Sequence, residues 1–228
     1  ACNLARLTNA PEIVLIYESG TIGTRPEVLP LSIGDGELAE TAACVVPLPE
    51  VFSHFLQAGR VDVGFLGAAQ VDRHGNLNST VIGPYDRPST RLPGAGGAPE
   101  IASHARQTFV VMKATPRSFV ERLAFRTSAG FLGGHGERAA SGARGGGPRA
   151  VITDFGILAP AADAEELTLS ALYADASVEE ARAAVGWPLA IAPQIERIAP
   201  PTPLELDTLR ALHARTAVAH QRPVELPL

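Results

Sequence analysis

Four apolar runs recur along the chain, separated by polar and helical stretches. They are EIVLIY (12–17), VDVGFLGAAQV (61–71), TFVVMKA (108–114) and RAVITDFGIL (149–158). The runs are rich in β-branched residues and show little alternation of apolar and polar positions, as is typical of strands in a sheet that is covered on both faces. We therefore predict a buried and mostly parallel sheet.

Amphipathic helical patterns lie between and after these runs. Ser177 and Glu180 have the spacing of a capping box at the start of one of them. Strands that alternate with helices indicate the α/β class, here an open, mostly parallel sheet with helices on both faces, in a single domain over residues 1–228. Ligands of such sheets bind beyond the carboxyl ends of the strands. The predicted helices span 47–60, 177–187 and 202–216.

Charge and composition exclude several classes of protein. A formal net charge of −5 and the lack of a basic stripe argue against a nucleic-acid partner. No apolar segment is long enough to span a bilayer and no signal peptide is recognisable, so we predict no membrane association and a cytoplasmic location. The two cysteines, Cys2 and Cys44, have no metal-ligand spacing, so neither a disulfide nor a metal site is expected. Cys44 is expected to be a small buried residue.

Glu18 directly follows the first apolar run and precedes a Ser-Gly turn, in the stretch IYESGTIG (16–23). Its position alone leaves two interpretations open. The residue is either a solvated carboxylate at the end of a strand, or a reactive carboxylate that the strand delivers to the mouth of a pocket. Ser19 is interpreted as part of the turn.

Three other stretches contain more glycine and polar residues than packing requires. In GAGGA, successive small residues let backbone N–H groups approach a ligand, although a tight structural turn would look the same. Neither a P-loop nor a dinucleotide-binding fingerprint is present. Gln70, Asn76 and Asn78 cluster in the first of the three. The stretches are LGAAQVDRHGNLNST (66–80), RLPGAGGAPEIAS (91–103) and TSAGFLGGHGER (127–138).

The remaining candidates carry weaker signals. His74 and His135 are flanked by glycines and are expected in exposed loops. The glycine-rich patch 141–150 is predicted to be a mobile surface loop, because no helical pattern follows it. Trp187 is expected in the core.

Taken in order along the chain, these stretches resemble the β subunit of the class I coenzyme A transferases, in the branch typified by the B subunit of glutaconate CoA-transferase. The matching features are ESG after an apolar run, GAAQVDRHGNLNST followed by IGPY, then GAGGA, TSAGF…GGHGER and VITDFGIL, over roughly residues 3–190. The resemblance implies the fold of the CoA-transferase and isomerase-like superfamily. It also implies an active site where an α and a β subunit meet.

The resemblance assigns roles to individual residues. It implies that Glu18 is the nucleophile of the family's E-[SN]-G motif, and that the backbone of Gly96, Gly97 and Ala98 contacts the thioester or CoA. Gln70 and Asn78 match polar positions around the pocket. Coenzyme A would be a co-substrate, with no permanently bound cofactor, and CoA would pass from an acyl-CoA to a free acid through an acyl-glutamyl anhydride and a glutamyl-CoA thioester.

The implied assembly contains an α subunit of the same transferase, as (αβ)₂ or (αβ)₄. The family has a further strand before the segment where this chain starts, so that strand is expected to be missing or not included. The chain also begins without Met and within a helical pattern, so we expect its numbering to begin inside a longer polypeptide.

Two other functions remain open at this point. The nearer is an acyl-CoA hydrolase of the β-keto ring-opening type on the same two-subunit fold; some of these relatives lack a glutamate at this position, so Glu18 favours transfer. A sensor or a sugar-phosphate isomerase on a related sheet is disfavoured, because no DNA-binding segment and no basic cluster for a phosphosugar is present. The acyl group is not predicted. A dicarboxylate would need a cationic anchor, for which Arg25, Arg87 and Arg91 are candidates.

Overall fold

The chain divides into two compact units. The computed structural model describes residues 1–220. Unit 1 consists of Ala1–Phe52 together with the residues from Pro201 onward, and unit 2 consists of Ser53–Pro200. The prediction of one family domain over the whole chain, without the family's first strand, stays a prediction.

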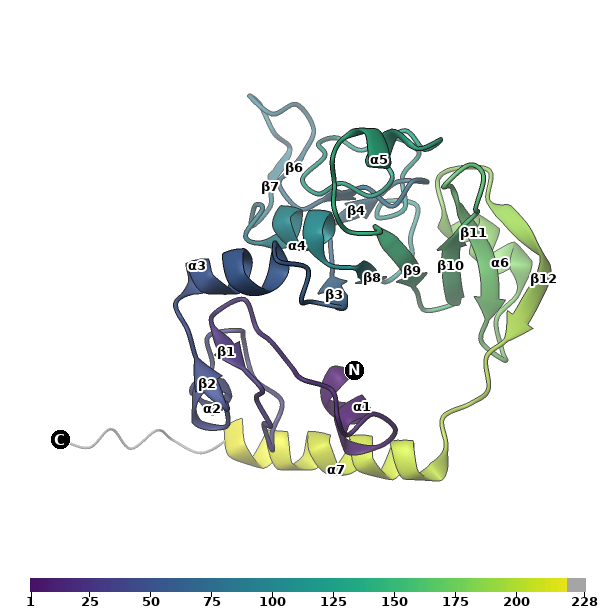
Figure 1. Ribbon diagram of the computed structural model, residues 1–228. Helices are drawn as coiled ribbons and strands as arrows, with labels where there is room; N and C mark the ends of the chain where they lie inside the picture. Colours follow the sequence, from purple (N-terminus) through teal and green to yellow (C-terminus); the bar gives the residue numbers. More distant parts are fainter. Residues whose placement is uncertain (221–228) are drawn as a thin grey trace. The chain divides into compact units, whose positions relative to one another are not determined.

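Unit 2 is built on a six-stranded sheet with the strand order β12-β11-β10-β9-β8-β3 (Figure 1). Strands β3, β8 and β9 are parallel, as are β11 and β12, whereas β10 is antiparallel to both of its neighbours. This mixed, mostly parallel α/β arrangement confirms the predicted fold class. The strands are β3 (Val63–Leu66), β8 (Gln107–Val111), β9 (Pro148–Ile152), β10 (Gly156–Pro160), β11 (Leu167–Leu172) and β12 (Ala190–Arg197).

One face of this sheet forms the core of unit 2. Val110, Val151, Leu158 and Leu169 are paired in register across four neighbouring strands, and each is at most 1% exposed. Helix α4 (Ala98–His104) packs on β3 and β8, and helix α6 (Val178–Ala184) contributes Ala181 to the same cluster. Burial of this apolar face provides most of the stabilisation of unit 2.

The opposite face of β3 and β8 is also apolar, which explains why the sequence shows little alternation. Phe65 and Phe109 pair across the two strands with perpendicular rings whose centroids are 5.5 Å apart, and Val111 is half exposed. Burial therefore alternates along these strands although polarity does not.

Short hairpins and one short helix lie outside the main sheet of unit 2. Strand β4 (Gln70–Val71) pairs with β5 (Leu77–Asn78), and β6 (Val81–Ile82) pairs with β7 (Thr90–Arg91). Helix α5 spans Glu137–Ala140. These segments contain the polar and glycine-rich motifs of the sequence.

Arg138 on α5 is 4% exposed and is enclosed by backbone carbonyl groups. Its guanidinium donates hydrogen bonds to the carbonyl oxygens of Ala102 (2.6 Å), Ala129 (3.1 Å), Gly130 (2.8 Å) and Gly145 (3.0 Å). No carboxylate within residues 1–220 forms an ion pair with it. Burial lowers the pKa of Arg138, and the nearby charge of Glu165 acts in the opposite direction.

Unit 1 contains small elements and one long helix. The strands β1 (Thr21–Ile22) and β2 (Cys44–Val45) form an antiparallel pair, and Asp35 caps the start of α2 through the N–H of Glu37. The helices are α1 (Cys2–Leu7), α2 (Gly36–Glu40), α3 (Leu48–Glu50) and α7 (Pro203–His220). The π-helix η1 (Val51–Leu56) follows α3 directly, and its residues from Ser53 onward belong to unit 2.

The predicted helices are confirmed, with changed boundaries. The segment 47–60 contains α3 and η1, and α7 extends the predicted 202–216 to His220. The capping box at α6 is present, because Ser177 accepts a hydrogen bond from the N–H of Glu180 while the Glu180 carboxylate accepts one from the N–H of Ser177.

Three strand predictions are wrong. The segment 61–71 is not one strand, because β3 ends at Leu66 in the main sheet and Gln70–Val71 form β4 in a separate two-stranded sheet. The segment 12–17 is no strand, because only Ile16 finds a partner, in an isolated bridge to Ile22, and residues 12–14 are exposed. The segment 149–158 is two antiparallel strands, β9 and β10. The hydroxyl of Thr153 accepts hydrogen bonds from the N–H groups of Phe155 and Gly156 and thereby closes a tight reversal between them.

The glycine-rich patch 141–150 is also more ordered than predicted. The N–H of Gly145 donates to the carbonyl of Ser103, and the N–H of Gly146 donates to that of Arg106, so the patch is attached to the end of α4 and the residues that follow it. Strand β9 begins within the patch, at Pro148. The prediction of a mobile surface loop is therefore wrong for residues 145–150.

Candidate functional site

Glu18 lies at the tip of a tight turn in unit 1. The N–H of Gly20 donates to the carbonyl of Tyr17 (3.0 Å), and the N–H of Tyr17 donates to the carbonyl of Thr21 (3.0 Å). Glu18 is therefore the second residue of a β-turn that closes a short irregular hairpin. Its side chain is partly exposed and forms no hydrogen bond or ion pair with residues 1–220.

Gly20 is required where this turn meets β2. Its φ is +115°, and a Cβ atom at this position would lie 2.1 Å from the carbonyl oxygen of Val46. The N–H of Val46 donates to the carbonyl of Gly20 (2.9 Å), so the close approach belongs to the pairing of the hairpin with the segment after β2. Any larger residue would displace the turn that presents Glu18.

Three hydroxyl groups beside Glu18 are buried without a hydrogen-bond partner in residues 1–220. They belong to Ser19, Thr21 and Thr24. Thr21 and Thr24 are 5% and 1% exposed. Buried hydroxyls are usually satisfied, so their grouping within six residues of chain sets this turn apart from the rest of the described structure. Burial also raises the pKa of the neighbouring Tyr17, while a hydrogen bond with Asn3 acts in the opposite direction.

The GAGGA loop in unit 2 leads into α4, as the sequence predicted. The N–H of Ala98 donates to the carbonyl of Ala95 (3.1 Å), and the N–H of Gly94 donates to the carbonyl of Ser79. The N–H groups of Gly96 and Gly97 have no acceptor within residues 1–220. Of the three predicted contact residues, Gly96 and Gly97 therefore have free donors, and Ala98 does not.

Gln70 and Asn78 are brought together, because they are paired in register in the β4–β5 hairpin. The Asn78 amide donates to the Gln70 side-chain oxygen (2.9 Å) and to the carbonyl of Val81 (2.7 Å), and its own oxygen accepts from the N–H of Thr80 (3.0 Å). Asn78 is completely buried and Gln70 is 9% exposed. Asn78 therefore supports the local backbone with all of its polar atoms, whereas the amide nitrogen of Gln70 has no acceptor within residues 1–220.

Asn76 connects the DRHGN turn to the TSAGF stretch. Its side-chain oxygen accepts hydrogen bonds from the N–H groups of Gly130 (2.8 Å) and Leu132 (3.1 Å), and its amide donates to the carboxylate of Asp72 (2.9 Å). Burial raises the pKa of Asp72, although the hydrogen bonds from Asn76 and His74 favour its charged form. These contacts are structural, and they join two motifs that are far apart in the sequence.

The arginine candidates for a carboxylate anchor are exposed. Arg91 lies over the ring of Tyr85, with its guanidinium carbon 5.0 Å from the ring centroid, and donates to the carbonyl of the same residue. Arg25 and Arg87 lie at the surface of their own units. Nothing in the geometry within either unit selects one of the three.

The histidine and cysteine predictions have mixed outcomes. His135 is exposed as expected, but His74 is partly buried, with its ring nitrogen 3.2 Å from the carbonyl oxygen of Glu165. Cys44 is exposed, so its prediction as a buried residue is wrong; it lies on β2, both of whose residues are exposed. Trp187 is 4% exposed and stacks with Phe119 in the core, as predicted.

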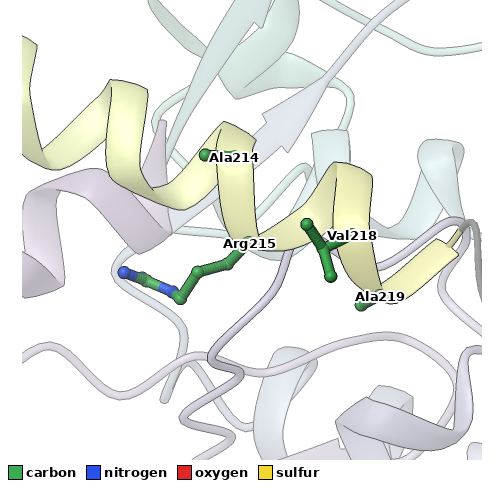
Figure 2. A pocket seen from close by; sticks show the side chains of 4 residues that line it. All are labelled: Ala214, Arg215, Val218 and Ala219. Carbon is green, nitrogen blue, oxygen red and sulfur yellow. The ribbon is translucent and has the colours of Figure 1, made fainter.

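A shallow pocket of about 410 Å³ lies on helix α7 (Figure 2). Among residues 1–220, its lining contains no acid and no nucleophile, and the only charged group is Arg215, whose Nε donates to the carbonyl of Glu27. None of the predicted site residues lines it, so it is not assigned to the chemistry. The lining residues are Ala214, Arg215, Val218 and Ala219.

Metal ligands and membrane-spanning helices are both absent from residues 1–220. No three histidine, cysteine or acidic side chains come together there as ligands for a metal ion. None of the helices in this part of the chain combines the length and the apolar character that a membrane crossing needs.

Hydroxyl groups next to the candidate site residues were not singled out by the sequence reasoning. The hydroxyl of Ser79 donates to Gly94 of the GAGGA loop, and the hydroxyl of Thr127 accepts from the N–H of Ser79. Thr21 and Thr24 follow Glu18 in the sequence and have buried hydroxyls without a partner within residues 1–220. Both sets lie within or next to the motifs that were singled out. Their position beside the motifs was the available signal, but single serine and threonine residues are too common in turns to be selected on that basis.

Comparison with known proteins identifies the family of the chain. Residues 1–183 match the coenzyme A transferase family. The chain is 55% identical over 220 residues to the B subunit of 3-oxoadipate CoA-transferase from Pseudomonas knackmussii, covering 96% of this chain and 85% of the relative. It is 34% identical over 204 residues to the B subunit of glutaconate CoA-transferase from Acidaminococcus fermentans, covering 87% of this chain and 76% of the relative.

The fold agrees with these sequence matches. The crystal structure of glutaconate coenzyme A-transferase from Acidaminococcus fermentans matches with a TM-score of 0.88 and 31% identity, over 97% of this chain and 86% of that one. Family match, identity and fold therefore point the same way, and they confirm the resemblance drawn from the motifs. The chain belongs to the coenzyme A transferase family, as a subunit of the B type.

Proposed function

We propose that this chain supplies the nucleophile of a two-subunit transferase that moves CoA from an acyl-CoA to a free carboxylic acid. The observation that carries the proposal is the position of Glu18 at the tip of a β-turn, with a carboxylate that no hydrogen bond or ion pair engages within residues 1–220. An unengaged carboxylate can attack a thioester without first giving up a partner.

The proposed reaction has four balanced steps. The Glu18 carboxylate attacks the thioester carbonyl, the C–S bond breaks, and an acyl-glutamyl anhydride and the CoA thiolate result. The thiolate attacks the glutamyl carbonyl, releases the first acid as its carboxylate, and leaves a glutamyl-CoA thioester. The incoming carboxylate attacks this thioester and again expels the thiolate. The thiolate then attacks the new acyl carbonyl and regenerates Glu18.

Each of these steps passes through a tetrahedral oxyanion. The free N–H groups of Gly96 and Gly97 are the donors we assign to it, with the remainder of the loop and Gln70 around the pocket. Preorganised amide donors stabilise such an oxyanion by about 3 kcal/mol each. A carboxylate is a weak nucleophile, so binding of the remote parts of CoA must also lower the barrier.

The relatives support the substrate and the partner that we propose. The identity of 55% over 96% of the chain supports 3-oxoadipate, or a dicarboxylic acid of the same size, as one of the two acids. The relatives are named as B subunits, which supports a complex with an A subunit. The assembly that we propose is (αβ)₂ or (αβ)₄. Part of the acyl pocket would then come from the partner.

The test is peptide mass spectrometry on the complex of this chain with its A subunit. The complex is incubated with a panel of acyl-CoAs that includes 3-oxoadipyl-CoA, without an acceptor acid, and is quenched with acid. We expect a CoA-sized adduct on the peptide that contains Glu18, and we expect added 3-oxoadipate to remove it. Glu18→Gln should abolish the adduct and reduce transfer by a factor on the order of 10⁴.

Glu40→Gln is the matched control. Glu40 is an exposed glutamate at the end of α2 in the same unit, so its replacement should change neither adduct nor rate. If free CoA accumulates steadily without any adduct, and Glu18→Gln leaves that release unchanged, the transferase mechanism is wrong and hydrolysis is the reaction.

A further inference from the structure

We propose that Ser79 is a positioning residue for the amide loop, and that Thr127 acts through it. The inference deepens the proposed function and rests on it. Two hydroxyl groups from two other motifs hold the GAGGA loop in the conformation that leaves the Gly96 and Gly97 donors free.

Ser79 is bonded to Gly94, the first glycine of the loop, in both directions. The Ser79 hydroxyl donates to the Gly94 carbonyl (2.7 Å), and the Gly94 N–H donates to the Ser79 carbonyl (2.9 Å). Beside them, the N–H of Leu92 donates to the carbonyl of Thr80 (3.0 Å). These bonds continue the β6–β7 hairpin up to the entrance of the loop. The hydroxyl bond is the only one of the three that a side-chain substitution can remove.

Thr127 holds Ser79 from the other side. Its hydroxyl oxygen accepts a hydrogen bond from the N–H of Ser79 (2.9 Å) and lies 2.7 Å from the hydroxyl of Thr80. The N–H of Thr127 donates to the carbonyl of Leu77 (2.8 Å). Thr127 of the TSAGF motif is therefore hydrogen-bonded to Ser79 of the NLNST motif, and Ser79 is hydrogen-bonded to Gly94 of the loop.

The conformation at the entrance of the loop needs this support. Gly94 has φ = +108°, and no atom lies within 4 Å of the place where a Cβ would stand, so packing does not restrain it. Further along the loop, the N–H of Ala98 donates to the carbonyl of Ala95. The N–H groups of Gly96 and Gly97 remain as donors, and their direction depends on the conformation at Gly94. Donors to an oxyanion act only when they are placed within a fraction of an ångström, so loosening the entrance should slow the chemistry.

The experiment measures the rate and the final amount of the Glu18 adduct in a single turnover, on the complex with the A subunit. For Ser79→Ala we expect a rate about tenfold lower, an unchanged final amount, and a KM for the acyl-CoA within about twofold of the parent value. Ser79→Thr keeps the hydroxyl and should restore most of the rate. Thr127→Val should behave like Ser79→Ala, and Thr127→Ser like the parent.

Ser170→Ala is the matched control. Ser170 is also partly buried, and its hydroxyl donates to a backbone carbonyl, that of Ile157 (3.1 Å), but it lies on β11, away from the motifs that lead to the loop. Its replacement should leave the adduct rate unchanged. A slow Ser170→Ala variant would show that loss of any such bond has the same effect, and would overturn the positioning role.

The possible outcomes separate the two proposals. A parent complex that forms no adduct contradicts the proposed function itself. If the parent forms the adduct and Ser79→Ala forms it at the same rate, only the positioning role is overturned. A lower final amount at an unchanged rate means that part of the variant is misfolded, and it also overturns the positioning role.

Discussion

The Glu18 turn and the GAGGA loop both use a glycine with positive φ, but they are held in opposite ways. In the turn, the backbone groups of Tyr17, Gly20 and Thr21 are bonded to one another. The carboxylate and the neighbouring hydroxyls have no partner within residues 1–220. In the loop, a side-chain hydroxyl holds the entrance at Gly94, while the backbone N–H groups of Gly96 and Gly97 have no acceptor in the same part of the chain.

The difference shows which atoms each region keeps available. A nucleophilic carboxylate has to be presented by a fixed backbone, and the hydrogen bonds among Tyr17, Gly20 and Thr21 fix the backbone of this turn. Amide donors have to be presented by fixed side chains, so the side chains around the loop are used instead. Within residues 1–220, the turn leaves a carboxylate without a partner and the loop leaves two backbone N–H groups without an acceptor, and these are the groups that the proposed chemistry uses.

Replacing Gly20 by Ala should have the largest effect among the glycine variants, because a Cβ would lie 2.1 Å from the carbonyl oxygen of Val46 at a φ of +115°. We expect the free energy of unfolding to fall by about 2 to 4 kcal/mol. We also expect the rate of Glu18 adduct formation to fall by on the order of 100-fold, since the turn itself would be displaced. Chemical denaturation and single-turnover mass spectrometry measure the two quantities.

Gly36→Ala is the control for this variant. Gly36 begins α2 in the same unit, and a Cβ added there would meet no atom within 4 Å, so alanine should be neutral or slightly stabilising. If Gly20→Ala were as stable and as fast as the parent, the close contact with Val46 would not define the turn.

Replacing Gly94 by Ala should have an intermediate effect. The position is sterically open, so only the backbone strain at φ = +108° acts, and we expect the protein to lose about 1 to 2 kcal/mol of stability. Because the loop would turn away from its bond with Ser79, we expect the adduct rate to fall by about tenfold. Thermal unfolding and the single-turnover assay measure the two effects.

Gly142→Ala separates strain from chemistry. Gly142 has a φ of +79° and is equally open, so alanine should produce a similar loss of stability there. It lies in the exposed first part of the 141–150 patch, so the adduct rate should not change. Equal slowing of both variants would mean that the rate follows stability alone and that the loop has no special part.

The smallest effect is expected at Asp35, which stabilises unit 1 without taking part in the turn. Hydrogen bonds from the N–H groups of Leu31 and Glu37 lower the pKa of Asp35. The folded state therefore binds fewer protons than the unfolded state, so this stabilisation is present above the usual carboxyl pKa of about 3.9 and is lost as the pH falls through the folded value.

Asp35→Ala should lower the free energy of unfolding by about 1 kcal/mol at pH 7 through loss of the helix cap, with no change in adduct rate. Asp35→Asn keeps a neutral cap, so its stability should approach that of the parent as the pH is lowered. Thermal unfolding between pH 7 and pH 3 tests this. A constant difference between parent and Asp35→Asn over that range would show that the carboxylate charge does not stabilise α2.

The fold class was predictable from the apolar runs at β3 and β8 and the helical pattern at α6. These patterns reflect which positions are buried, and they can be recognised within short segments of the sequence. The first apolar run was mistaken for a strand because strand formation needs a partner, and only Ile16 finds one. Similarly, the reversal between β9 and β10 is closed by a backbone hydrogen bond from Thr153 to Gly156 and by the Thr153 hydroxyl, which hydrophobic periodicity does not reveal.

The same distinction between local patterns and contacts with distant residues applies to the candidate site. Glu18, Gly96 and Gly97 could be proposed from the sequence because short motifs in a fixed order are specific, and their roles stay predictions. The role proposed for Ser79 could not, because it depends on the hydrogen bond to Gly94 beyond the β6–β7 hairpin. Asn78 was placed around the pocket on sequence grounds, and only its buried hydrogen bonds reveal that it supports the backbone.

The carbonyl cage around Arg138 has a consequence for how unit 2 folds. The guanidinium exchanges its hydration shell for carbonyl groups from α4, from residues 129–130 and from Gly145, which are separate stretches of chain. A partly closed cage would leave a desolvated charge with too few acceptors, so partial closure is unfavourable. We therefore expect the three stretches to assemble cooperatively, so that α4, into which the amide loop leads, forms together with them rather than on its own.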